Sequence, residues 1–189
     1  PIQEAIDMAG PRDLILVSSG VYYENPILYK PVRLQGSGYR TIISANPVPT
    51  ERANNWIGKV TQLMGGNPFG ANGSPGILVV GSDQGPFSWV NLQPNRRARI
   101  DGFQILGAIT GGGMMVYNLA EDLRISNNRI VGNQGTSAGG IAVGLQDNLG
   151  TVFGNTNVVI EYNQIFKNGG VNGAGGIAIY TGAEGYRIR

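Results

Sequence analysis

Residues 98–118 read ARIDGFQILGAITGGGMMVYN, residues 122–144 read DLRISNNRIVGNQGTSAGGIAVG, and residues 157–182 read NVVIEYNQIFKNGGVNGAGGIAIYTG. Each copy has the same order: a short apolar strand, a tight turn, a second strand, a glycine-rich turn and a third strand. Ile100, Ile125 and Ile160 head the three copies, and Ile188 begins a fourth. A repeat of this kind predicts a solenoid, in which each copy is one coil stacked on the previous coil.

The isoleucines predict the core of this solenoid. Side chains alternate along a strand, so the three heading isoleucines point inward, as do Ile105, Ile130 and Ile165 in the second strands. Coils stack about 4.8 Å apart, so each isoleucine should lie on its equivalent in the coil below. The result is a continuous core that no single coil could bury.

Asparagine and glycine recur at fixed places in the turns. The repeated asparagines of the second and third copies are Asn128 and Asn163 at the tight turn, and Asn133 and Asn168 after the second strand. Stacked asparagines can hydrogen-bond to each other and to the turn backbone. The first copy has Phe103 and Ala108 there, so we expect the ladders to begin at the second copy. We interpret the glycine pairs as sites of positive φ; they are Gly112-Gly113, Gly139-Gly140 and Gly175-Gly176.

The N-terminal part predicts a cap followed by the first coils. Ile2, Ala5, Ile6 and Ala9 have the spacing of an amphipathic helix within residues 1–10. A helix of two turns is not stable alone, so it must pack on an apolar surface. In residues 11–45 we expect strands at Leu14–Val17, Pro26–Tyr29, Val32–Gln35 and Thr41–Ser44.

Residues 46–98 break the rhythm and predict a long loop excursion. It contains a short helix at Glu51–Met64 and one strand at Ile77–Val80. We expect it to pack over the outside of the coils. The face formed by the third strands is small and flat, with Met115, Ala142 and Ala178 outward, so it is the surface that we expect the excursion to cover. Another subunit or a sugar chain is the alternative occupant of that face. Residues 1–189 are thus expected to form one domain, with regular coils over 99–189, and to be a fragment of a longer chain.

Two N-terminal segments carry a resemblance to a known family. The G-V-Y-x-E segment at Gly20–Glu24 and the G-x-G-x-x-T-I-I segment at Gly36–Ile43 resemble the cap and first coils of right-handed parallel β-helix proteins of the pectin-lyase-like superfamily. That superfamily includes pectate lyases, pectin methylesterases, polygalacturonases and bacterial surface proteins. The resemblance implies an all-β, right-handed parallel β-helix (solenoid) with a short N-terminal capping helix.

Composition narrows the chemistry. The chain has 189 residues and neither cysteine nor histidine, which excludes disulfides and thiolate metal sites and removes the commonest general base. Its net charge is only +2, and no basic run extends beyond Arg96-Arg97-x-Arg99, so nucleic-acid binding is not expected. No apolar run is long enough to span a membrane.

Charged side chains gather on the outer face of the first strands. One outward column is Asp101, Ser126, Glu161 and Arg189, and its neighbour is Arg99, Arg124, Val159 and Arg187. In enzymes of the superfamily that the chain resembles, the active groove lies on an outer strand face, which makes Asp101, Glu161 and Arg124 the candidate catalytic residues. The two carboxylates should lie two rungs apart, roughly 10 Å, on the wide side for a glycosidase pair. The alternative is a ladder of exposed ion pairs that contribute ~0–1 kcal/mol each.

Other candidates are aromatic or acidic. Trp56, Trp89, Tyr117 and Tyr180 are the candidate ligand-binding residues, through stacking on a sugar. Glu121-Asp122 and Asp147-Asn148 lie in predicted turns, where carboxylates and carbonyls could hold Ca²⁺. No D-x-D-x-D-G string supports such a site, so solvated acidic turns are the alternative, and we otherwise expect no metal or cofactor.

The leading functional hypothesis is a non-catalytic segment of a secreted or cell-surface bacterial β-helix protein, used for structure, adhesion or assembly. Its expected partners are polysaccharide, other surface proteins or further copies of itself. One rival is a carbohydrate-active enzyme, either a polysaccharide lyase or a glycoside hydrolase. A third hypothesis is a carbohydrate-binding module without turnover.

Overall fold

The computed structural model describes residues 1–70, 73–89, 97–144 and 154–189. The described residues form two helices and many short strands, and every pair of named strands is parallel. No described helix has the length and apolar character needed to cross a membrane.

Three sheets contain most of the strands. The first sheet contains β1 (Leu14–Val17), β4 (Arg33–Gly36), β7 (Arg99–Asp101), β10 (Arg124–Ser126), β15 (Val159–Glu161) and β20 (Arg187–Ile188). The second contains β2 (Gly20–Tyr22), β5 (Thr41–Ser44), β8 (Gln104–Leu106), β11 (Arg129–Val131) and β16 (Gln164–Phe166). The third contains β3 (Ile27–Leu28), β6 (Ile77–Val80), β9 (Met114–Asn118), β13 (Ile141–Val143) and β18 (Ile177–Ile179). Two smaller pairs are β12 (Gln134–Gly135) with β17 (Gly169–Gly170), and β14 (Asn155–Thr156) with β19 (Ala183–Glu184).

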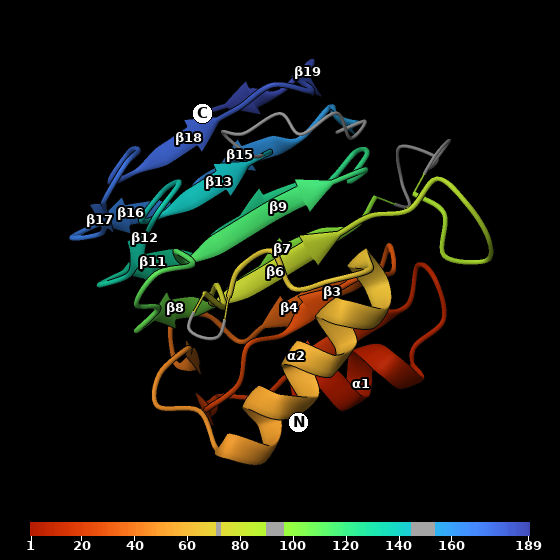
Figure 1. The fold of residues 1–189 in the computed structure, drawn as a ribbon, viewed down its shortest axis with the longest axis horizontal. Helices are drawn as coiled ribbons and strands as arrows, with labels where there is room; N and C mark the ends of the chain where they lie inside the picture. Colours follow the sequence, from red (N-terminus) through yellow and green to blue (C-terminus); the bar gives the residue numbers. More distant parts are fainter. Residues whose placement is uncertain (71–72, 90–96, 145–153) are drawn as a thin grey trace.

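The chain visits the three sheets in the same order on each pass. In every sheet, hydrogen-bonded neighbours come from successive passes, so the strands stack as the chain advances (Figure 1). The two ends of the chain lie at opposite ends of this stack. The arrangement is compatible with the parallel β-helix expected from the repeat.

The register confirms the isoleucine columns. Ile125 pairs with Ile100 on one side and with Ile160 on the other, and Ile160 pairs with Ile188. In the second sheet Ile130 pairs with Ile105 and Ile165. The members from Ile100 to Ile160 and Ile105 to Ile130 are almost fully buried, and Ile165 is partly buried in the same core.

The glycine pairs have a different role from the expected one. Of the six glycines only Gly112 has a positive φ, at 77°. Apart from Gly176, which has open space around it, the others are needed for space. A Cβ on Gly113 would lie 2.4 Å from Cγ2 of Ile130, and one on Gly140 would lie 2.3 Å from the carbonyl oxygen of Gly176. Close stacking of coils, not backbone handedness, therefore requires most of these glycines.

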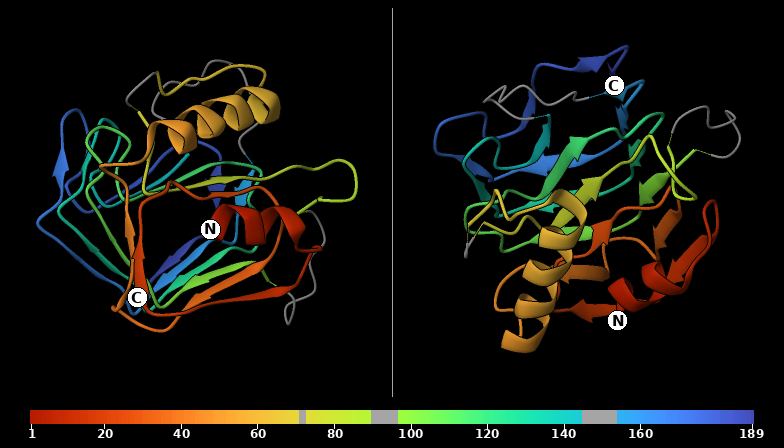
Figure 2. Two further views of the ribbon diagram at one scale, coloured as in Figure 1. Left: turned by 90° about the horizontal axis from the view of Figure 1, so that it is seen from below. Right: turned by 45° about the vertical axis from the view of Figure 1, so that its right-hand side comes forward.

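Helix α1 (Ile2–Met8) covers the first end of the core (Figure 2), as expected. Ile2 and Ile6 are buried in the core. The carboxylate of Glu24 accepts hydrogen bonds from the N–H groups of Ile2 and Gln3, both at 3.0 Å. At the other end Lys30 Nζ donates to the carbonyls of Asp7 and Ala9, at 2.7 and 2.8 Å. An anion at the N-terminus and a cation at the C-terminus both stabilise a helix.

Helix α2 (Thr50–Met64) lies outside the coils against the third sheet (Figures 1 and 2). Its Trp56 and Val60 form a second buried cluster with Leu78, Met115 and Ala142. The excursion therefore covers the flat third-strand face, as the sequence predicted. Strand boundaries agree within a residue at β4, whereas the short strands β2, β12, β14, β17 and β19 were not predicted.

Candidate functional site

The carboxylate of Asp101, on the outer side of β7, is bound on both oxygens. Oδ1 forms an ion pair with Arg99 at 2.9 Å. Oδ2 accepts hydrogen bonds from Ser126 Oγ at 2.6 Å and Asn127 Nδ2 at 2.8 Å. Burial raises the pKa of Asp101, but these hydrogen bonds and Arg99 outweigh it and hold the pKa below its ordinary value. Asp101 is therefore a fixed anion.

Glu161 lies two strands further along the same column. The register Asp101–Ser126–Glu161 places it on β15, with β10 between. Its carboxylate forms ion pairs with Arg124 and Arg189, the latter at 2.8 Å. Burial raises the pKa of Glu161, and the hydrogen bonds from the two arginines lower it by more. Arg124 thus forms its ion pair with Glu161, whereas Asp101 is paired with Arg99, so Arg124 does not bring the two carboxylates together in one cluster.

These ion pairs differ from the exposed ladder considered as the alternative. Arg124 and Arg189 are exposed and Arg99 is half-buried, but Asp101 and Glu161 are only 6% and 1% exposed. The reason is the stacking of rungs, since each carboxylate is covered by side chains of the neighbouring coil.

A column of arginines runs beside the carboxylates. Backbone register aligns Arg33, Arg99, Arg124, Val159 and Arg187 on successive strands. Arg33 was not placed in this column by the sequence, because the long excursion hides the pairing of β4 with β7. We call this outer face of the first sheet, together with Arg189, the arginine face. Its arginines outnumber the two carboxylates of Asp101 and Glu161, so the face carries an excess of positive charge.

A groove opens where the first sheet turns into the second. This corner groove has a volume of about 440 Å³ and is lined by Gly38, Tyr39, Asn127, Asn128, Arg129, Tyr162 and Gln164. Tyr39 and Tyr162 are 61% and 68% exposed. Asn127 and Tyr162 both have φ of 56°, so equivalent left-handed turn residues present their side chains at the corner. Sequence reasoning missed this groove, although the alignment of Tyr162 with Asn127 in the repeat was a usable signal.

Arg129 is the cation of the corner groove. Its guanidinium lies 5.3 Å from the ring centroid of Phe166. Its Nε is buried without a hydrogen-bond partner, and none of the ion pairs between described residues includes Arg129. The groove therefore combines two exposed aromatic rings, amide groups and a cation that no carboxylate of the described residues neutralises.

The four aromatic residues predicted to bind ligand lie elsewhere. Trp89 is completely buried, with Nε1 3.4 Å from the carbonyl of Tyr29, and Trp56 is buried beneath α2. Tyr117 packs edge-on against Phe69, and the Tyr180 hydroxyl donates to the carbonyl of Ser137 at 2.7 Å. Burial raises the pKa of Tyr117 and of Tyr180. All four contribute to packing, and none lines the corner groove.

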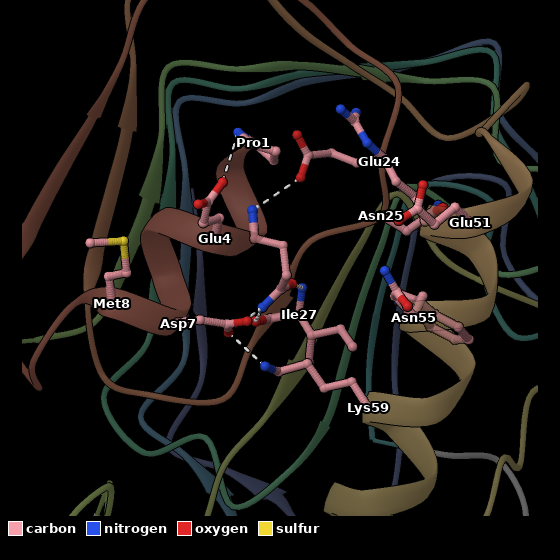
Figure 3. Close-up of a pocket in the computed structure, with 13 residues that line it drawn as sticks. Pro1, Glu4, Asp7, Met8, Glu24, Asn25, Ile27, Glu51, Asn55 and Lys59 are labelled. Carbon is pink, nitrogen blue, oxygen red and sulfur yellow. Dashed lines mark hydrogen bonds and ion pairs between the residues drawn. The ribbon is translucent and has the colours of Figure 1, made fainter.

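A second cleft, of about 530 Å³, lies between α1 and α2 (Figure 3). Asp7 Oδ1 accepts hydrogen bonds there from Lys59 Nζ at 2.6 Å, Gln3 Nε2 at 2.9 Å and Tyr29 Oη at 3.1 Å. Burial raises the pKa of Asp7, and these donors lower it by more. Burial and the Asp7 charge raise the pKa of Tyr29 to about 12. The polar groups of this cleft hold α2 to the cap helix.

The structure places part of the acidic residues that the sequence suggested as Ca²⁺ ligands. Asp122 forms an ion pair with Arg97 at 3.5 Å. Asp147-Asn148 lie outside the described residues. Within the described ranges, no three acidic, cysteine or histidine side chains come together in a way that would hold a metal ion.

Comparisons with protein-family models, with curated proteins and with solved structures found no match to this chain.

Proposed function

We propose that this chain is a non-catalytic segment of a secreted or cell-surface bacterial protein, with the right-handed parallel β-helix architecture of the pectin-lyase-like superfamily that its sequence resembles. Its role in this proposal is structural, adhesive or in assembly. The observation that supports it most is that both candidate catalytic carboxylates, Asp101 and Glu161, bind side chains of neighbouring coils.

Those contacts tie neighbouring coils together. Asp101 on β7 accepts from Ser126 on β10, and Glu161 on β15 binds Arg124 on β10. A general acid or base works best with a pKa near the operating pH. The pKa values of Asp101 and Glu161 are lowered, which moves them away from neutral pH. The side chains that resemble catalytic groups are better suited to stiffening a rod.

A cleavage panel tests this proposal. The full-length protein is incubated with pectic, mannuronic, xylan and glucan polysaccharides, and unsaturated uronides and reducing ends are measured over hours. We expect no turnover, and sustained product release from any substrate overturns the proposal. Electron microscopy of the same protein is expected to show narrow rods.

Carbohydrate binding without turnover is a second candidate, and the corner groove favours it. Sugar rings have apolar faces that stack on exposed aromatic rings, and their hydroxyls bond to amides such as those of Asn127 and Gln164. Tyr39→Ala and Tyr162→Ala should each abolish retention on a glycan array. Tyr23→Ala is the matched control, because Tyr23 is 45% exposed and lies outside the groove.

A further inference from the structure

We propose that the arginine face docks on a lipid bilayer that contains anionic phospholipid, and that two leucines at the first end of this face enter the apolar part of the bilayer. The inference goes beyond the proposed function and is independent of carbohydrate binding in the corner groove. It rests on the side chains that share the outer columns of the first sheet.

The first argument is a pair of exposed leucines on the outer side of β1. Ile15 and Val17 of this strand pack in the core. Side chains alternate along a strand, so Leu14 and Leu16 point outward, where they are 44% and 70% exposed. A further strand paired with β1 would lie beside it in the plane of the sheet and would leave both leucines exposed. A solvated sheet face carries polar outward residues, so these leucines indicate a surface that meets an apolar partner.

The second argument is the positive charge that continues from the leucines. The register pairs Leu14 with Arg33 on the next strand. The same outward column then contains Arg99, Arg124 and Arg187. Arg33 and Arg187 are exposed, and none of the ion pairs between described residues includes either of them. Strands are about 4.8 Å apart, so the column extends about 24 Å from the leucines, and lipid phosphates can pair with arginines along it.

The third argument is that a bilayer uses both parts of this surface. Its anionic headgroups attract arginines, and its apolar interior accepts leucine side chains. A soluble polyanion would pair with the arginines but would leave the leucines in water. A second copy of the chain that docked through the same face would bring arginine columns together, and like charges across an interface oppose association.

Sedimentation with vesicles tests the inference. The full chain is mixed with vesicles of phosphatidylcholine alone, or of phosphatidylcholine and phosphatidylglycerol in equal amounts, and the bound fraction is measured at several salt concentrations. We expect binding to the anionic vesicles only, and less of it as salt rises. Arg33→Gln and Arg187→Gln should each weaken binding about fivefold. Leu14→Ser and Leu16→Ser should each weaken it about tenfold, because a leucine no longer leaves water.

Two control variants remove the same kinds of side chain outside the face. Arg52→Gln removes an exposed arginine of α2, and Val171→Ser removes an apolar side chain that is 71% exposed and follows β17. Both should bind the anionic vesicles like the unmodified chain. Circular dichroism spectra of all the variants should match that of the unmodified chain, because the replaced side chains lie at the surface.

Each of the other results overturns the inference. Equal binding to the neutral vesicles would show that anionic lipid is not required. Weaker binding in the arginine variants together with unchanged binding in both leucine variants would show general attraction to polyanions. Equal losses in the face variants and the controls would show that no particular face is used. Sedimentation without vesicles would show self-association, and a lack of sedimentation with either kind of vesicle would show that the chain does not bind bilayers.

Discussion

The side-chain oxygen of Asn163 accepts two hydrogen bonds from Asn128, one from the backbone N–H at 3.0 Å and one from Nδ2 at 3.1 Å. Asn128 repeats this arrangement one coil earlier, where its oxygen accepts from the N–H of Phe103 and its Nδ2 donates to the carbonyl of Ile100, both at 3.0 Å. Each asparagine therefore satisfies turn groups of the preceding coil, and the ladder begins at the second copy as the sequence predicted.

Replacing Asn128 by alanine should lower the free energy of unfolding by about 1–3 kcal/mol, because buried N–H and C=O groups lose their partners. Urea unfolding followed by circular dichroism measures the change. Asn54→Ala, at an exposed position of α2, should stay within about 0.5 kcal/mol. Equal effects at the two positions would contradict a stabilising ladder.

Ile130→Asn should prevent folding, since it buries an amide between Ile105 and Ile165, which offer its side chain no hydrogen bond. The readout is the thermal unfolding transition together with soluble yield. Ile109→Asn serves as the control, because Ile109 is 50% exposed. An unchanged melting temperature in Ile130→Asn would be incompatible with the stacked-coil core.

Gly140→Ala and Gly58→Ala should have opposite effects on stability. The new Cβ at residue 140 would clash with the carbonyl of Gly176 and with Ile165, whereas nothing lies within 4 Å at residue 58 in α2. We expect Gly140→Ala to destabilise by more than about 1 kcal/mol and Gly58→Ala to stabilise by about 0.5–1 kcal/mol. Denaturant titration of both variants checks the signs, and stabilisation by Gly140→Ala would refute the close-packing explanation.

Acid should remove the contribution of the buried carboxylates. The pKa values of Asp101 and Glu161 are lowered in the folded state, so their stabilisation is complete above the ordinary carboxyl pKa of about 4 and is lost as the pH falls below it. The free energy of unfolding, measured from pH 7 down to pH 2, should decline more steeply in the wild type than in the Asp101→Asn, Glu161→Gln double variant. Parallel curves would show that these ion pairs add nothing.

The repeat made the fold predictable because period and packing have the same cause. Ile100, Ile125 and Ile160 recur at equal positions, and only a stack of parallel strands brings them together. The helices were predictable from spacing, and so was the covered third-strand face. The φ angles of the glycine pairs could not be predicted, because a glycine required by close stacking cannot be distinguished in sequence from one required by a turn.

The candidate site was harder to predict because it depends on neighbours in other coils. The sequence placed Asp101 and Glu161 in one outward column. The partners that join them to other coils, Ser126 for Asp101 and two arginines for Glu161, stand at least 25 residues away in the chain. Trp89 was expected at a ligand surface and lies in the core, since a loop tryptophan has no periodic neighbours that would reveal its packing. Arg129 and the two exposed tyrosines meet only through the stacking register.

The most direct test compares stability and cleavage in Asp101→Asn. Thermal unfolding and product release from the polysaccharide panel are measured side by side for the wild type and this variant. If the role of Asp101 is to link neighbouring coils through Ser126, the melting temperature of Asp101→Asn is lower than that of the wild type, and neither protein releases product. Product release by the wild type that is lost in Asp101→Asn, with an unchanged melting temperature, would contradict the account.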